Sequence, residues 1–257
     1  MQQDVVRIGD AEIQVSVGGQ GEPLLFLHSA QGFWPDQPFV RMLCETRRLI
    51  APSHPGFGRS TLPDWIDRVD DIAHIYLELL DHYGLQKLDV VGCSIGGWIA
   101  AELATKVPER FRRLVLVGPI GVKTGSPDQL DLPDLFALSR EEVAQLMFHD
   151  PVASAPDYSA MPEEDLSIVV RNQETLTLLG WEPYMHNPKL RHRLHRVKVP
   201  TLLLRGESDG LVSADYLDRY AQLIPGARTD TIPAAGHAPQ VEQPRAFVAR
   251  VNNFLAA

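Results

Sequence analysis

Gly-Cys-Ser-Ile-Gly, at residues 92–96, is the stretch of this sequence that decides the fold. The stretch Leu-Asp-Val-Val at residues 88–91 precedes it and predicts a buried strand, while residues 97–104 have the composition of a helix. A serine on a tight turn between a strand and a helix projects its hydroxyl beyond the edge of the sheet. Such a turn strains the backbone and needs small residues two positions to either side, here Gly92 and Gly96. We interpret Ser94 as a nucleophile; an ordinary turn between strand and helix is the alternative.

A serine hydroxyl needs a base to take its proton and an acid to orient that base. Both residues occur downstream of Ser94 in the chain order that accompanies this turn. Residues 199–206 predict a buried strand with Asp209 in the loop after it, and residues 227–232 predict another strand with His237 in the following loop. Because parallel strands end at the same edge of a sheet, we expect both side chains to lie near Ser94.

The acid has two alternative placements in this fold. Glu207 stands two residues before Asp209 in the same loop and is its main rival. The turn at residues 118–121, after the apolar run at residues 114–117, holds no carboxylate, which closes the placement after that strand.

An oxyanion intermediate requires two N–H donors. The backbone N–H of Ile95 begins the helix after Ser94, where the helix dipole adds positive potential. We expect the second donor in the loop at residues 28–32, after the apolar run at residues 23–27, and assign it to Ala30, with Ser29 as the neighbour that could take its place.

These motifs, together with Pro-Gly-Phe-Gly-Arg-Ser at residues 55–60, resemble the α/β-hydrolase superfamily over nearly the whole chain. The resemblance implies an eight-stranded, mostly parallel sheet covered by helices on both faces, and no cofactor. The chain departs from the usual pattern at Ser29, where glycine is common, and at Ser53, near which an aspartate is common. Dehalogenases and epoxide hydrolases of this fold use an aspartate nucleophile, and Ser94 argues against both.

The order of predicted elements agrees with that fold. Strand-like segments lie at residues 4–8, 11–17, 24–27, 48–51, 88–91, 114–117, 201–204 and 228–232. Strands that alternate with helices predict a mostly parallel sheet. A long proline-marked gap interrupts the alternation and contains helical stretches at residues 140–148 and 163–179. We predict a hydrolase core at residues 1–121 and 198–257, with a helical cap at residues 122–197.

Composition excludes several classes of function. The net charge of −9 and the lack of a long basic cluster argue against nucleic-acid binding. The first residues lack the blocks of a signal peptide and no apolar run approaches a membrane span, so we expect a cytoplasmic protein without a membrane partner. Cys44 and Cys93 predict neither a disulfide nor a metal site. The sequence leaves the oligomeric state open between monomer and homodimer.

The motifs predict a serine hydrolase that cleaves a small or medium apolar carboxylic ester through an acyl-enzyme. Ser29 flanks the expected site, and Arg171 lies in the predicted cap. Candidate pocket walls are Phe33, Trp34, Trp98, Met147, Phe148 and Trp181.

Three alternatives stay open. Arg171 and Asn172 resemble the segment that binds the substrate carboxylate in carbon–carbon hydrolases of dienoate acids, although those enzymes usually carry asparagine where Cys93 stands. Lactonase, thioesterase or amidase activity would use the same three residues. A ligand-binding receptor or pseudoenzyme of this fold is the non-enzymatic alternative.

Overall fold

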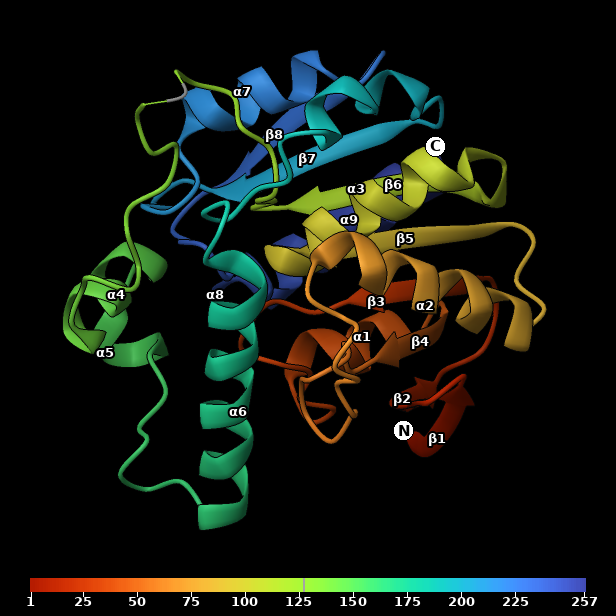
Figure 1. Ribbon diagram of the computed structural model, residues 1–257, viewed down its shortest axis with the longest axis horizontal. Helices are drawn as coiled ribbons and strands as arrows, with labels where there is room; N and C mark the ends of the chain where they lie inside the picture. The colour runs from red at the N-terminus through yellow and green to blue at the C-terminus, as the bar shows by residue number, and fades with distance from the viewer. Residues whose placement is uncertain (127) are drawn as a thin grey trace.

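The sheet has the architecture that the sequence predicts. The computed structural model describes residues 1–126 and 128–257, and within them eight strands form one sheet in the order β1-β2-β4-β3-β5-β6-β7-β8 (Figure 1). The strands are β1 (Gln2–Ile8), β2 (Ala11–Gly18), β3 (Pro23–Leu27), β4 (Arg48–Pro52), β5 (Leu88–Cys93), β6 (Phe111–Val117), β7 (Thr201–Gly206) and β8 (Arg228–Ile232). The β1–β2 and β2–β4 pairs are antiparallel, and all other pairs are parallel.

Helices cover both faces of the sheet. They are α1 (Pro38–Cys44), α2 (Val69–His82), α3 (Ile95–Lys106), α7 (Ala214–Gln222), α8 (Pro239–Glu242) and α9 (Pro244–Ala256), with a short 3₁₀ turn η1 (Pro108–Arg110). Side chains of a strand alternate between the faces, so Leu25 and Leu27 pack toward α2 and α3, while Leu24 and Phe26 pack toward α1 and α9. The continuous apolar runs in the sequence are therefore strands that are buried on both sides.

The chain between β6 and β7 leaves the sheet. This inserted segment, residues 122–197, contains α4 (Arg140–Met147), α5 (Pro151–Ser154), α6 (Glu163–Gly180) and the 3₁₀ turns η2 (Leu190–His192) and η3 (Leu194–Arg196). Figure 1 shows α4, α5 and α6 beyond one end of the strands. The predicted helices at residues 140–148 and 163–179 agree with α4 and α6 to within one residue.

The two ends of the inserted segment meet beside α3. The N–H of Gly121 donates to the carbonyl of Met185, and the N–H of Asn187 donates to the carbonyl of Gly121, both at 3.0 Å. A Cβ on Gly121 would lie 2.2 Å from Cγ of Trp98, so the chain passes directly over this α3 side chain. The chain therefore leaves the core at Gly121 and comes back beside it at Met185 and Asn187.

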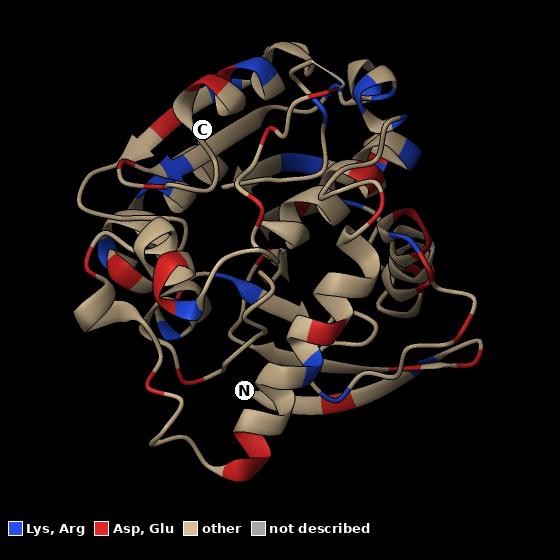
Figure 2. Cartoon of the chain, turned by 60° about the vertical axis from the view of Figure 1, so that its left-hand side comes forward, with Lys and Arg blue, Asp and Glu red and all other residues tan. Residues whose placement is uncertain are grey.

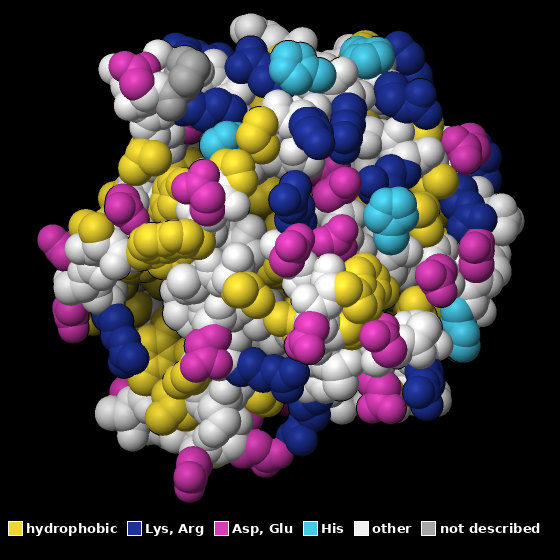
Figure 3. All heavy atoms as spheres, in the orientation of Figure 1, with side chains coloured by type: hydrophobic (Ala, Val, Ile, Leu, Met, Phe, Trp, Pro, Cys, Tyr) yellow, Lys and Arg dark blue, Asp and Glu magenta, His cyan; other side chains and the backbone are white. Residues whose placement is uncertain are grey.

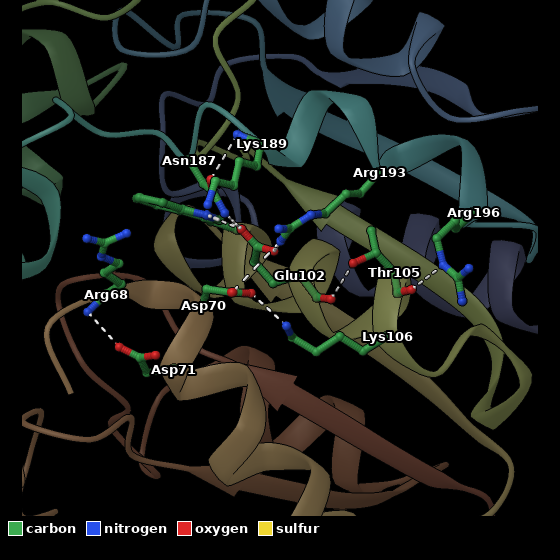
Figure 4. Close-up of polar contacts among 11 residues, drawn as sticks. Arg68, Asp70, Asp71, Glu102, Thr105, Lys106, Asn187, Lys189, Arg193 and Arg196 are labelled. Atoms are coloured by element: carbon green, nitrogen blue, oxygen red, sulfur yellow. Dashed lines mark hydrogen bonds and ion pairs between the residues drawn. The ribbon is translucent and has the colours of Figure 1, made fainter. Parts of the chain in front are cut away.

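A buried carboxylate supports this attachment. Glu102, on α3, is fully buried, and its Oε1 accepts hydrogen bonds from Nδ2 of Asn187 at 2.6 Å and from Nε1 of Trp98 at 3.3 Å. Figure 4 shows Glu102 pointing toward Asp70 of α2 and Arg193. Asp70 in turn pairs with Lys106 at 2.7 Å. The cluster joins α2, α3 and the last part of the inserted segment.

The surface carries both signs of charge, which are interspersed along helices and loops in Figure 2. Among the described residues, no helix is long and apolar enough to cross a membrane.

Exposed apolar side chains gather on the inserted segment, and Figure 3 shows hydrophobic atoms concentrated on that side of the molecule. They are Leu130, Val152, Val170, Leu178 and Trp181.

Candidate active site

Ser94 lies on the strained turn between β5 and α3. Its backbone has φ 54° and ψ −115°, a left-handed conformation that is unfavourable for any residue but glycine. A Cβ on Gly92 would lie 2.4 Å from the carbonyl oxygen of Gly96, and one on Gly96 would lie 2.2 Å from that of Leu27. Only glycine fits at either position, which confirms the steric reason for the spacing of the motif.

Asp209 and His237 meet at the same edge of the sheet. Both are buried, and Oδ2 of Asp209 lies 3.0 Å from Nδ1 of His237. Oδ1 of Asp209 accepts the backbone N–H groups of Leu211 at 2.9 Å and Val212 at 2.8 Å. The carboxylate is therefore held on both oxygens, and it can hold the imidazole in a fixed orientation.

The end of β6 contacts both Ser94 and the Asp209–His237 pair. The N–H of Ser94 donates to the carbonyl of Val117 at 2.8 Å, and a Cβ on Gly118 would lie 3.0 Å from the His237 ring. Among the described residues, no hydrogen bond joins the Ser94 hydroxyl to His237. In unliganded enzymes such bonds are often long and tighten when substrate binds.

Glu207 occupies a different position. Its Oε2 accepts the N–H of Ala234 at 3.4 Å, in the loop that leads to His237, and its side chain is exposed. The imidazole of His237 is bonded by Asp209 and not by Glu207. Of the two carboxylates in this loop, the structure brings Asp209 to the histidine.

The loop after β3 has few free N–H groups. The N–H of Gln31 donates to Oγ of Ser29 at 3.3 Å, and that of Gly32 donates to the Ser29 carbonyl at 3.0 Å. These two groups are already bonded within the loop, whereas the N–H groups of Ser29 and Ala30 have no hydrogen bond among the described residues. On the other side, Ile95 is the first residue of α3, where a backbone N–H has no partner within the helix.

Two stacked histidines lie behind this loop. The rings of His28 and His54 are 3.8 Å apart, and Nδ1 of His54 lies 2.5 Å from the hydroxyl of Tyr76. Nε2 of His28 accepts the N–H of His54, so the only ring proton is on Nδ1, which donates to the carbonyl of Ser29. A ring with one proton is neutral. Burial lowers the pKa of His28 to about 4 and that of His54 well below its usual value, so both rings are uncharged at neutral pH. The pair fixes the ends of β3 and β4 relative to each other.

The candidate pocket residues of the core are held by their own packing. Phe33 packs against Phe26 in the layer of α1 and α9, with ring centroids 5.9 Å apart. Nε1 of Trp34 donates to the carbonyl of Gln31 at 3.0 Å. Trp98 is buried beneath Gly121.

The candidates of the inserted segment divide into two groups. Met147 and Phe148, at the end of α4, touch the loop at residues 233–238, which contains His237 and is here called the histidine loop. A Cβ on Gly236 in this loop would lie 2.2 Å from the carbonyl oxygen of Met147. Trp181 is 61 % exposed at the end of α6, with its ring against Phe136. Met147 and Phe148 are thus beside the site, whereas Trp181 faces outward.

Arg171 and Asn172 anchor α6 to the turn at residues 55–60. Nη2 of Arg171 donates to the carbonyl of Ser60 at 2.6 Å, and Oδ1 of Asn172 accepts the N–H of Gly58 at 2.8 Å. Nδ2 of Asn172 is buried without a partner among the described residues, and a Cβ on Gly32 would lie 2.6 Å from it. The free donor beside the loop after β3 therefore belongs to Asn172, which the sequence indicated only as the neighbour of Arg171.

Within the described residues, no group of His, Cys, Asp or Glu side chains has the arrangement of a metal site. Cys44 and Cys93 are free cysteines. Cys93 is buried, and burial raises the pKa of its thiol, which keeps the sulfur protonated and unreactive.

Comparison with known proteins agrees with this geometry. A family profile described as "Alpha/beta hydrolase family" matches residues 24–251. The chain belongs to the alpha/beta hydrolase family. It is an enzyme of that family, and its relatives are named hydrolases.

Relatives in the alpha/beta hydrolase family are named for different substrates. A 2-hydroxymuconate semialdehyde hydrolase of Pseudomonas putida is 30% identical, and the alignment covers 93% of this chain and 88% of the relative. A pimeloyl-[acyl-carrier protein] methyl ester esterase of Nitrosomonas europaea is 28% identical, over 93% and 97% of the two chains. The crystal structure of a serine hydrolase from Cycloclasticus zankles has a TM-score of 0.81 at 19% identity, over 99% and 98%, and shares the fold.

Proposed function

We propose that this alpha/beta hydrolase cleaves a small or medium apolar carboxylic ester through an acyl-enzyme. The observation that carries the proposal is the Asp209–His237 hydrogen bond beside a serine on a strained turn. Asp209, bonded at both oxygens, keeps the imidazole with its proton on Nδ1 and Nε2 free to act as a base.

The reaction follows from these positions. His237 removes the proton of the Ser94 hydroxyl as its oxygen attacks the ester carbonyl, and the N–H groups of Ile95 and Ala30 stabilise the oxyanion. The imidazolium then protonates the leaving alcohol. A water molecule, deprotonated by the same imidazole, hydrolyses the acyl-enzyme in the second half of the reaction.

In this proposal the inserted segment is a cap over the site. Its α4 supplies Met147 and Phe148 next to the histidine loop, and its α6 brings Asn172 next to Gly32 of the loop after β3. The apolar character of Met147 and Phe148 supports an apolar acyl group. Trp181, which faces outward, is not part of the proposed wall.

The test is a short-chain p-nitrophenyl ester assay combined with fluorophosphonate labelling. The parent enzyme should hydrolyse the ester and be labelled at Ser94. Ser94→Ala should remain folded, lose several orders of magnitude of turnover and resist the label. Labelling at another serine, or residual activity above a few per cent, would overturn the assignment.

A second candidate is carbon–carbon hydrolysis of a dienoate acid. Two observations favour it. A Pseudomonas putida relative that is 29% identical, over 98% of this chain and 96% of the relative, is named a 2-hydroxy-6-oxo-2,4-heptadienoate hydrolase. Nδ2 of Asn172 has no partner among the described residues and can donate to a substrate oxygen. Asn172→Asp keeps the oxygen that holds Gly58 but removes the donor and adds a negative charge. If the substrate carboxylate binds there, kcat/KM for a dienoate acid should fall at least about tenfold more than for a neutral ester. Equal losses would exclude this candidate.

A further inference from the structure

Glu242, the last residue of α8, accepts hydrogen bonds from two segments that are far apart from each other in the sequence. Its Oε2 accepts the N–H of Gly236, directly before His237, at 2.5 Å. Its Oε1 accepts the N–H groups of His149 at 2.8 Å and Asp150 at 3.2 Å, at the corner between α4 and α5. One half-buried carboxylate therefore bridges the histidine loop and the inserted segment.

The same corner contacts both loops of the Asp209–His237 pair. The carbonyl of Leu146 accepts the N–H of Gly210, the residue after Asp209, at 2.9 Å. The carbonyl of Met147 accepts the N–H of His237 itself at 2.6 Å. The backbone next to Asp209 and that of His237 are thus hydrogen-bonded to the end of α4. Glu242 adds a second connection between the histidine loop and the inserted segment.

We propose that Glu242 is a positioning residue that makes the placement of His237 depend on the seating of the cap. The proposal rests on the proposed serine hydrolase function. When the α4–α5 corner is in place, Gly236 and His237 are held on both sides, by Glu242 and by Met147. When the corner moves away to admit substrate, the Met147 contact is lost, and Glu242 loses the two cap N–H groups that orient it. The base is then fully positioned only under a seated cap.

The chemistry of the bridge explains why a carboxylate is needed. Three N–H donors from two segments require two acceptor oxygens, and charge strengthens each hydrogen bond. An amide has one acceptor oxygen, and its NH₂ group would face an N–H donor on one side. Glu242→Gln should therefore release either Gly236 or the α4–α5 corner while the side chain keeps its size.

The experiment compares Glu242→Gln with Glu207→Gln, since Glu207 also accepts an N–H from the histidine loop but is not bonded to the inserted segment. For each variant, kcat and KM for a small p-nitrophenyl ester are measured, together with the rate and the final extent of fluorophosphonate labelling. Misplacement of a catalytic group by a distant substitution lowers turnover by roughly ten- to hundredfold. We expect a loss of that size in kcat and in the labelling rate for Glu242→Gln, with KM and the final labelled fraction unchanged. Glu207→Gln should match the parent within about threefold.

The possible results separate the proposal from its alternatives. A merely structural role would reduce the final labelled fraction but leave the labelling rate per labelled site unchanged, and that result overturns the proposal. Equal losses in both variants overturn it too. If Glu242→Gln yields no labelled protein, Glu242→Asp, which keeps both oxygens on a shorter side chain, takes its place, and a parental labelling rate there overturns the proposal. Failure of the proposed function itself is distinguishable, because the parent would then neither turn over the ester nor take up the label.

Discussion

Asp209 holds His237 through one carboxylate oxygen and is itself held through the other. Oδ2 lies 3.0 Å from Nδ1 of the imidazole, while Oδ1 accepts two backbone N–H groups at 2.8 and 2.9 Å. An acid fixed in this way has little freedom to rotate, so the orientation of the imidazole is fixed with it.

We predict that Asp209→Asn lowers kcat by about 10⁴ while the fold stays intact, because asparagine keeps the contact but favours the wrong imidazole tautomer. Glu207→Gln should change kcat by less than about threefold, since Glu207 does not contact the imidazole. Ester turnover of the two variants at equal labelled protein is the measurement. A larger loss for Glu207→Gln would mean that the acid has been assigned to the wrong carboxylate.

Arg171→Ala should change neutral-ester kcat/KM by less than about tenfold. In the structure its guanidinium donates to the carbonyls of Ser60 and Gly58, so the side chain holds α6 in place. Loss of these contacts should appear as a lower free energy of unfolding, by about 1–3 kcal/mol. Chemical denaturation and ester kinetics check the two effects separately. A collapse of neutral-ester turnover in a folded variant would contradict this structural role.

Gly96→Ala should destabilise the chain by more than about 3 kcal/mol or prevent folding, because the new Cβ would lie 2.2 Å from the carbonyl oxygen of Leu27. Gly84→Ala is the matched control. Gly84 has a positive φ of 64°, and a Cβ there meets nothing within 4 Å, so only the torsional cost of about 1–2 kcal/mol remains. Urea unfolding of both variants gives the comparison, and similar losses would show that the close approach at the turn is not decisive.

Glu102→Gln should change how stability depends on pH. Burial raises the pKa of Glu102 from 4.5 to about 7, so between these values the folded chain holds a proton that the unfolded chain has lost. This stabilisation is complete below about pH 4.5 and declines as the pH rises toward 7, by roughly 3 kcal/mol in all. Glutamine retains the Oε1 that accepts from Asn187 and Trp98 but does not titrate.

The free energy of unfolding, measured across about pH 5 to 8, should therefore fall less steeply for Glu102→Gln than for the parent. Glu109→Gln, at an exposed position beyond the end of α3, serves as the control and should keep the parental slope. An unchanged slope in Glu102→Gln would show that this carboxyl is ionised in the folded chain throughout the range.

Local rules explain what could be predicted from the sequence. The turn requires glycine at positions 92 and 96, and the motifs around it resemble the α/β-hydrolase superfamily, which implies the fold. Asp209 and His237 each follow a predicted strand, which is why they could be expected at the same edge of the sheet as Ser94. The partner of Arg171 and the free donor of Asn172 could not be predicted in this way. Both depend on how α6 lies against the turn at residues 55–60, which is more than a hundred residues away.

The contacts of Glu242 could not be predicted from the sequence either. Nothing in the sequence around it indicates that its carboxylate reaches His149 and Asp150, because that contact is set by the path of the inserted segment. Glu102 likewise stands on an α3 that is buried over almost its whole length, and its partner Asn187 follows 85 residues later.

The contact of Gly121 with Met185 and Asn187 has an evolutionary consequence. Because the inserted segment departs and returns at adjacent points, its length does not affect the geometry of β6 and β7, and each doubling of such a loop costs only about 0.6 kcal/mol of closure entropy. Insertions or deletions between residues 122 and 185 that keep the α4–α5 corner leave β5, β7 and β8, the strands before Ser94, Asp209 and His237, in place. In the proposed hydrolase, selection can therefore remodel which molecules reach Ser94, provided that the α4–α5 corner beside His237 is kept.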